Sequence, residues 1–253
     1  MWSPDQYLTY AALRGRPYWE LLSRIGCDDP RRIVDLGCGP GNLTEHLASR
    51  WPNAIIEAID SSAEMVTAAR ARGVHAQVQD VRDWHPTPGT DIVISNATLQ
   101  WVSDHRDLLT RWPTELHVGS WMAIQVPGNF DAPSHRIIRA LAESPMWRPQ
   151  LGGLLRGPET VDDPTGYARL LEAVGCVVDA WETTYLQSLT GPDPVLEWVT
   201  GTALTPVRDV LDDDDWDRFR RDLAPRLRAA YPPAIDGRTH FPFRRVFAVA
   251  QVR

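Results

Sequence analysis

Short apolar runs alternate with amphipathic segments along most of this chain. Five runs are typical of buried strands, at residues 31–36, 54–59, 74–78, 91–95 and 120–126, and longer apolar segments follow at 176–189 and 241–252. Between them, apolar residues recur at helical spacing in segments 42–50, 63–72, 104–116, 134–143 and 165–173. Strands that alternate with helices predict an α/β fold, in which a parallel sheet carries helices on both faces.

Three regions depart from this alternation. Residues 5–25 predict a helix that Pro17 interrupts or restarts. Residues 128–157 form a loop-rich stretch around one helix, and residues 192–232 are mostly helical, with an acidic cap at 212–215. We expect a single domain over residues 1–253, with residues 1–26 as an N-terminal helical lid. The inserts at 128–157 and 190–236 are expected to form a substrate cap.

A glycine-rich turn follows the first predicted strand. Gly37, Gly39 and Gly41 alternate after Asp35, and the helical pattern begins directly behind them. Glycines allow close approach of a ligand to the backbone, so this turn predicts a nucleotide-binding site. The spacing is not the G-x-G-x-x-G of dinucleotide enzymes, and no Lys-Ser or Lys-Thr follows as in a P-loop. The D-x-G-x-G-x-G form resembles motif I of class I S-adenosylmethionine-dependent methyltransferases, which implies that Cys38 and Asn42 also contribute to the cofactor site.

Polar residues close four successive apolar runs, namely Asp35, Asp60, Asp80 and Asn96. Ligands of parallel sheets bind at the carboxyl ends of the strands, so these residues are candidates for the same site. Asp60, with Ser61 beside it, is placed to accept hydrogen bonds from ribose hydroxyls. Asp80 and the N–H of Val81 are placed to read the adenine. Asn96 is expected to approach the methionyl group, and the sequence after it is not the Asn-Pro-Pro-Tyr type of DNA adenine methyltransferases.

Composition excludes several other classes of function. The net charge is −7 and no Lys/Arg block is present, which argues against nucleic-acid binding. No stretch approaches 18 apolar residues, so we expect no membrane partner. The three scattered cysteines suggest a reducing cytoplasm, without a disulfide framework or a metal site.

Segments outside the glycine turn narrow the resemblance. The chain resembles the trans-aconitate 2-methyltransferase family over nearly its whole length. This resemblance rests on residues 7–22, 35–42, 59–62, 96–101, 125–129, 183–185 and 197–199, and on Pro133, His135, Phe241, Pro242 and the arginine pair at 244 and 245. It implies a Rossmann-like, mostly parallel seven-stranded sheet with an antiparallel last strand. It also implies a cytoplasmic enzyme that esterifies one carboxylate of a small tricarboxylate, trans-aconitate, using S-adenosyl-L-methionine and releasing S-adenosyl-L-homocysteine.

A tricarboxylate bound to an acidic protein needs local cations and neutral donors, and arginine suits carboxylates because its planar fork binds them bidentately. The substrate candidates are Arg16, Trp19, Gln100, Trp101, His135, Tyr185, Arg244 and Arg245. Arg14 is expected instead at the carboxylate of the cofactor. Side chains alternate along a strand, so only one of Arg244 and Arg245 should point inward.

The reaction requires no catalytic dyad. A carboxylate nucleophile is already ionised at pH 7, so proximity and orientation suffice and no catalytic residue is assigned. Three alternatives remain open at this point: methylation of another small acid or a natural-product hydroxyl, a non-catalytic S-adenosylmethionine-binding protein, and an NAD-binding dehydrogenase domain. The sequence does not determine the oligomeric state or which carboxylate reacts.

Overall fold

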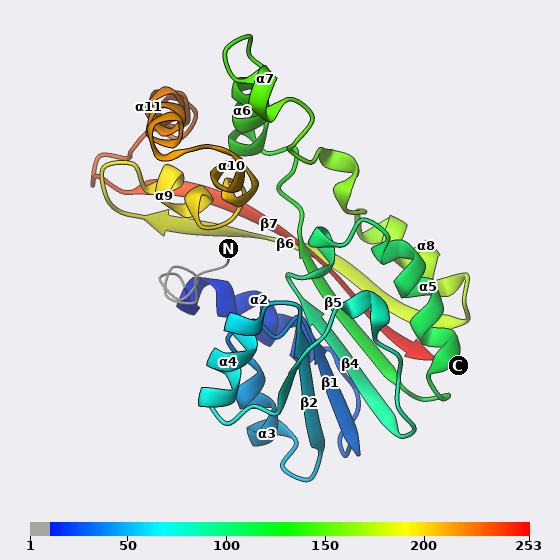
Figure 1. Ribbon diagram of the computed structural model, residues 1–253. Coiled ribbons are helices and arrows are strands. Elements are labelled where there is room, and N and C mark those ends of the chain that lie inside the picture. Colours follow the sequence, from blue (N-terminus) through cyan, green and yellow to red (C-terminus); the bar gives the residue numbers. More distant parts are fainter. Residues whose placement is uncertain (1–10) are drawn as a thin grey trace. The chain divides into compact units, whose positions relative to one another are not determined.

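A seven-stranded sheet organises the chain, and the computed structural model describes residues 11–253, with side chains from Gly15 onward (Figure 1). The strand order is β3-β2-β1-β4-β5-β7-β6. The strands are β1 (Arg32–Leu36), β2 (Ile55–Asp60), β3 (Ala76–Val78), β4 (Thr90–Asn96), β5 (Trp121–Pro127), β6 (Cys176–Leu189) and β7 (Thr239–Val252). Strands β1 to β5 pair in parallel, whereas β7 pairs antiparallel with β5. The predicted Rossmann-like sheet with its antiparallel last strand is confirmed.

Helices lie between the strands as the sequence pattern predicts. They are α2 (Ala11–Ser23), α3 (Leu47–Arg50), α4 (Ala63–Ala71), α5 (His105–Glu115), α6 (Pro133–Ala142), α7 (Arg148–Leu151), α8 (Pro164–Glu172), α9 (Pro194–Thr200), α10 (Thr205–Val210) and α11 (Asp213–Ala230). Among the described residues, no helix is both long and apolar enough to cross a membrane. The acidic cap expected at 212–215 is present, since Asp212 accepts the Asp215 N–H at the start of α11. In the same way Ser62 accepts the Met65 N–H at the start of α4.

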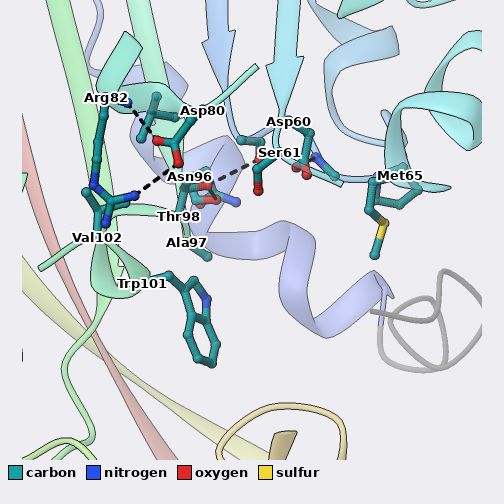
Figure 2. Close-up of a pocket in the computed structure, with 14 residues that line it drawn as sticks. Asp60, Ser61, Met65, Asp80, Arg82, Asn96, Ala97, Thr98, Trp101 and Val102 are labelled. Carbon is teal, nitrogen blue, oxygen red and sulfur yellow. Dashed lines mark hydrogen bonds and ion pairs between the residues drawn. The ribbon is translucent and has the colours of Figure 1, made fainter. Parts of the chain in front are cut away.

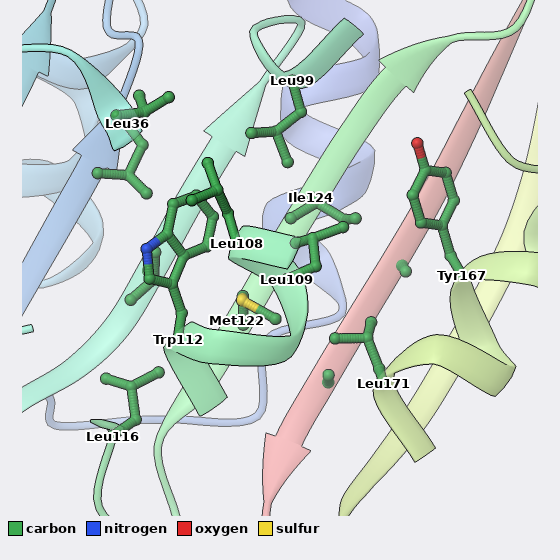
Figure 3. Close-up of a cluster of buried hydrophobic side chains, with 14 of the residues drawn as sticks. Leu36, Leu99, Leu108, Leu109, Trp112, Leu116, Met122, Ile124, Tyr167 and Leu171 are labelled. Atoms are coloured by element: carbon green, nitrogen blue, oxygen red, sulfur yellow. The ribbon is translucent and has the colours of Figure 1, made fainter. Parts of the chain in front are cut away.

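Alternate side chains of the strands pack against helices on opposite faces of the sheet. Ile59 of β2 belongs to the large cluster that includes α5 and α8, whereas the adjacent Ala58 packs with Val66 and Ala69 of α4. Figure 3 shows Trp112 of α5 and other apolar residues of the large cluster against the strands. Strand side chains alternate in direction, so apolar residues of the same strand point to both faces of the sheet. Each face is therefore covered by helices.

The chain divides into two compact units. The sheet unit comprises the described residues up to Pro127, with Val161–Thr183 and Arg245–Arg253. The helical unit contains Gly128–Thr160 and Thr184–Arg244. Both predicted inserts, 128–157 and 190–236, fall in the helical unit. Their expected role as a substrate cap, and that of residues 1–26 as a lid, stay predictions.

The helix expected over residues 42–50 is wrong in extent. A 3-10 turn, η1 (Thr44–His46), comes first and α3 contributes a single helical turn. The hydroxyl of Thr44 donates to the buried Asp35 carboxylate at 2.6 Å, and this hydrogen bond holds the segment that contains Thr44 against β1. Pro52 then disfavours helical geometry at Trp51, so the segment cannot extend.

The expectation that Pro17 interrupts or restarts the first helix is also wrong. Helix α2 continues through Pro17, although a proline removes one backbone hydrogen bond. Tyr18, Leu21 and Leu22 follow directly and are buried, and this packing offsets the lost bond. The third strand begins only at Ala76, because the Val74 N–H is used by the carbonyl of Ala69 at the end of α4.

An ion cluster around the buried Asp91 carboxylate joins the amino end of β4 to neighbouring segments, with Arg31 and His117 exposed at the surface. The Asp91 carboxylate accepts the Arg31 backbone N–H at 2.6 Å and the Arg31 guanidinium at 2.8 and 3.0 Å. The His117 ring nitrogen Nε2 lies 2.8 Å from the same carboxylate. These hydrogen bonds, the Arg31 side chain first, hold the pKa of Asp91 at about 2, below its ordinary value of 3.8.

We expect Asp91→Asn to remove about 2 kcal/mol of stability at pH 7, because the folded state binds the ionised carboxylate more favourably than the unfolded chain does. A carboxylate whose pKa is lowered in the folded state stabilises the protein at pH values above its pKa in the unfolded chain. This stabilisation is lost as the pH falls through the pKa of the folded state, so the difference in unfolding free energy between the two proteins should shrink by about half at pH 3. Urea unfolding of both proteins at pH 7 and pH 3 measures this. The exposed Asp29→Asn is the matched control. An equal difference at both pH values would contradict the assignment.

Candidate functional site

The glycine turn after β1 is held by the end of β2. The backbone N–H groups of Gly37 and Cys38 both donate to the carbonyl of Ile59, at 2.8 and 3.0 Å. The Gly39 N–H donates to Asp60 Oδ2 at 2.9 Å, and the Ser62 N–H donates to Asp60 Oδ1 at 2.9 Å. A single strand-end carboxylate therefore fixes both the glycine turn and the start of α4.

The three glycines of this turn share positive φ angles of 80°, 56° and 75° but differ in what surrounds them. A Cβ on Gly37 would lie 2.0 Å from Thr98 Oγ1, and one on Gly41 would lie 2.9 Å from the Cβ of Ala69. A Cβ on Gly39 would meet no atom of the described structure within 4 Å. Gly37 and Gly41 thus permit close packing of the protein on itself, whereas Gly39 leaves open space beside the cavity.

A cavity of about 190 Å³ opens at the carboxyl ends of β1, β2 and β4 (Figure 2). It is lined by Gly37, Gly39, Pro40, Asp60, Ser61, Met65, Asp80, Val81, Arg82, Asn96, Ala97, Thr98, Trp101 and Val102. Figure 2 shows Asp60, Ser61 and Met65 on one side of the view and Asp80, Arg82 and Val102 on the other, with Asn96, Ala97 and Thr98 between them. The sequence predicted this meeting of strand ends.

Carboxylates give the cavity wall a negative character. Burial is the largest influence on Asp60 and raises its pKa, while the two backbone N–H donors oppose that shift. Asp80 accepts the Arg82 backbone N–H at 2.9 Å and pairs with the Arg82 guanidinium at 3.0 Å. Arg82 also binds Asp104 at 2.9 Å, which anchors the arginine at the rim.

The residues that line the cavity suit S-adenosylmethionine in charge and leave room beside the backbone at Gly39. That cofactor carries a sulfonium and an ammonium group, which carboxylates favour. The open space at Gly39 leaves room for a ligand close to the backbone. The buried Oδ1 of Asn96 has no hydrogen-bond partner among the described residues, so an acceptor is available on the cavity wall. Within the same described residues, no group of three His, Cys, Asp or Glu side chains is arranged to hold a metal ion.

Several expected cofactor residues do not line this cavity, namely Asp35, Cys38, Gly41 and Asn42. Asp35 is buried and binds Thr44, and burial raises its pKa to about 6. Burial likewise raises the pKa of the Cys38 thiol, which makes it a poor nucleophile. The side chain of Arg14 lies outside the described residues. Direct cofactor roles for these residues stay predictions.

Several further residues line the wall although the sequence pattern did not predict them as site residues, namely Pro40, Met65, Arg82, Ala97, Thr98 and Val102. Ala97 has a φ of 59°, the only positive value at a non-glycine position in the described chain. Such strain often marks a functional turn, but it becomes visible only in coordinates. Pro40, Ala97 and Thr98 had a sequence signal, because each lies inside a segment that carried the resemblance, 35–42 or 96–101.

The expected substrate residues fall into both units. In the sheet unit, Trp101 lines the cavity, whereas Gln100 is buried and donates to the Ala97 carbonyl. Arg16 and Trp19 are exposed on α2 and do not line the cavity, and the Trp19 ring lies 5.1 Å from that of His46. Arg245 is buried, with 7% of its surface exposed, and donates to Gln125 Oε1 at 3.4 Å.

The helical unit contains the other three candidates. His135 packs edge-on against Phe130, and burial, helped by Arg139 and Arg156, lowers its pKa to about 4. Tyr185 is buried on β6. Arg244 is half-buried and donates to the Gly128 carbonyl at 3.4 Å. Contact of these residues with a substrate stays a prediction.

Fold and site together define a methyltransferase. A family model described as a methyltransferase domain matches residues 10–180. A trans-aconitate 2-methyltransferase of Rhodococcus jostii (strain RHA1) is 62% identical over 100% of both chains. The enzyme of that name from Mycobacterium tuberculosis (strain ATCC 25177 / H37Ra) is 55% identical, over 100% of this chain and 97% of its own. The chain therefore belongs to the trans-aconitate 2-methyltransferase family.

Solved structures support the fold at much lower identity. The YcgJ protein of Bacillus subtilis is 12% identical with a TM-score of 0.57, and the match covers 93% of this chain and 97% of that one. A geranyl diphosphate C-methyltransferase of Streptomyces coelicolor A3(2), solved with S-adenosyl-L-homocysteine, is 16% identical with a TM-score of 0.54, covering 96% of this chain and 80% of that one. These similarities show the fold alone.

We expect Asp60→Asn to weaken binding of S-adenosylhomocysteine by about 10- to 100-fold, because a hydrogen bond to a charged acceptor contributes about 1.5–3 kcal/mol. Calorimetric titration of the purified proteins measures the dissociation constant. Glu57→Gln is the matched control, since this carboxylate lies on the same strand, pairs with Arg32 and does not line the cavity. An unchanged constant for Asp60→Asn would refute the role of this residue.

Gly39→Val should abolish cofactor binding without unfolding the protein, because its side chain would project into the open space beside the cavity. Gly73→Val is the control, since Gly73 also has a positive φ and open surroundings but does not line the cavity. Both variants should lose similar stability in thermal unfolding, about 1–2 kcal/mol for the left-handed backbone. Only Gly39→Val should lose S-adenosylhomocysteine binding. Normal binding by a folded Gly39→Val would contradict the interpretation of the turn.

Proposed function

We propose that this protein is an S-adenosylmethionine-dependent carboxyl O-methyltransferase that esterifies one carboxylate of trans-aconitate. The observation that carries the proposal is the 62% identity to a trans-aconitate 2-methyltransferase over the whole chain, including the segments outside the cofactor motif. The cavity at the strand ends supports it independently, because it offers carboxylates and open backbone to a cationic cofactor.

Within the cavity, we assign roles to the strand-end residues. Asp60 and Ser61 bind the ribose hydroxyls, since each Asp60 oxygen retains a lone pair beyond its backbone bond. Asp80 and Val81 face the adenine, and the Arg82 ion pair keeps the Asp80 carboxylate oriented. Asn96 accepts a donor of the methionyl portion through its unpartnered Oδ1.

The reaction needs orientation rather than proton transfer. When bound, the cofactor supplies a methyl group activated by a sulfonium. The acceptor carboxylate is ionised at pH 7, so the protein has to hold it in line and exclude water. Trp101 supplies an apolar surface on the cavity wall for this purpose, and the buried Arg245 supplies positive charge in the same unit. No side chain is required as a base.

We also propose that the protein acts in the cytoplasm on a free small molecule. Cys27, Cys38 and Cys176 are all free thiols, which suits a reducing compartment. The formal charge of −7 disfavours a polyanionic partner such as nucleic acid.

Incubation with radiolabelled S-adenosylmethionine and trans-aconitate should yield a methyl ester, detected as label that mild base releases. A panel of di- and tricarboxylates and phenols, run alongside, separates this activity from methylation of another acid or of a hydroxyl. Titration with NAD is the control for a dehydrogenase. Absence of base-labile label with trans-aconitate, from protein that binds S-adenosylhomocysteine, would refute the proposed substrate.

A further inference from the structure

Gln125 lies on the strand next to Asn96, which lines the cofactor cavity, and on the same face of the sheet. In β5 it pairs in register with Asn96 of β4 on one side and with Phe247 of β7 on the other. Residues paired in register point to the same face of a sheet. Asn96 lines the cofactor cavity, so the Gln125 side chain lies on the same face, one strand farther along.

The amide of Gln125 has a defined orientation. Its Oε1 accepts from Arg245 Nη1 at 3.4 Å. Turning the amide over would place an NH₂ group against a guanidinium, which only donates, so the observed orientation is the favourable one. Only 1% of the surface of Gln125 is exposed, so water does not reach its amide nitrogen Nε2. This nitrogen has no hydrogen-bond partner among the described residues.

A buried hydrogen-bond donor without an acceptor lowers the stability of the protein, and a ligand that supplies the acceptor removes this cost. Here the donor stands next to a buried guanidinium, so the two groups together offer N–H donors and positive charge. The neighbouring Phe247 stacks on Trp181 with ring centroids 4.8 Å apart, which supplies an apolar neighbour on the same face. Convergent donors, a cation and an apolar neighbour match the chemistry of a carboxylate on an unsaturated carbon skeleton.

We propose that Gln125 Nε2 donates a hydrogen bond to a carboxylate of the acceptor acid, and that Arg245 supplies the adjacent charge. The inference rests on the proposed function and extends it to a substrate-binding residue. Gln125 acts in binding only, since it transfers no proton. Its position next to Asn96 brings the acceptor toward the cofactor cavity.

The test is calorimetric titration of trans-aconitate into protein saturated with S-adenosylhomocysteine, paired with KM and kcat measurements. Gln125→Leu should raise the dissociation constant and KM for trans-aconitate by about 10- to 100-fold, the effect of losing a hydrogen bond to a charged group. Gln125→Glu should lose more, because its carboxylate neutralises Arg245 and repels the ligand. Gln251→Leu is the matched control, a glutamine at the other end of the same β5–β7 ladder. The Gln251→Leu variant should bind trans-aconitate with the affinity of the wild type.

Binding of S-adenosylhomocysteine should stay within about twofold of wild type in every variant, which separates loss of the acceptor from loss of fold. Wild-type affinity for trans-aconitate in Gln125→Leu would overturn the inference, as would a parallel loss of both ligands in Gln125→Leu and Gln125→Glu. If Gln125→Leu does not fold, Gln125→Glu decides by the same comparison. Wild-type protein that binds S-adenosylhomocysteine but neither binds nor methylates trans-aconitate would instead refute the proposed function.

Discussion

The bond from the Gly39 N–H to the Asp60 carboxylate is the constraint on which the site depends. It joins the turn after β1 to the end of β2, and the second carboxylate oxygen starts α4 through the Ser62 N–H. The Ile59 carbonyl adds two further bonds to the same turn. The turn at residues 37–39 and the junction of β2 and α4 at 59–62, which are distant in the sequence, are therefore held together at one edge of the sheet. The cavity exists because this connection keeps the turn open at Gly39 while the flanking glycines pack closely.

Burial of acidic groups at this edge prepares the protein for a cationic ligand. Desolvation raises the pKa of Asp60 on the cavity wall, so its ionised carboxylate is destabilised in the free protein. A nearby positive charge relieves that cost, and S-adenosylmethionine carries positive charge. For the methyl acceptor the charges are exchanged, because Arg245 is a buried cation of the protein and the proposed substrate is an anion. A carboxylate on the cavity wall thus favours a cationic methyl donor, and a buried guanidinium in the same unit favours an anionic acceptor; such complementarity contributes to specificity.

Local sequence predicted the sheet well, because buried parallel strands are short apolar runs and the helices between them are amphipathic. It predicted Asp60, Asp80 and Asn96 as wall residues for the same reason: strand ends of a parallel sheet meet at one edge. Two predictions from local sequence were wrong. At residues 42–50 the Thr44–Asp35 hydrogen bond overrides helical propensity, and at Pro17 the burial of the following residues outweighs one lost backbone hydrogen bond. In each case a tertiary contact decided against the local preference.

Short-range periodicity and residue types at fixed spacing encode the strand and helix order, the glycine turn and the family, so all three can be read from the amino-acid sequence. What each glycine does depends on long-range packing, because the atoms facing Gly37 and Gly41 come from Thr98 and Ala69, distant in the chain. The tertiary structure also decided that Asp35 turns to Thr44 rather than to the cavity, and that Arg245 is buried against Gln125 while Arg244 is not. Such outcomes depend on which side chains meet across strands, and no local pattern encodes that meeting.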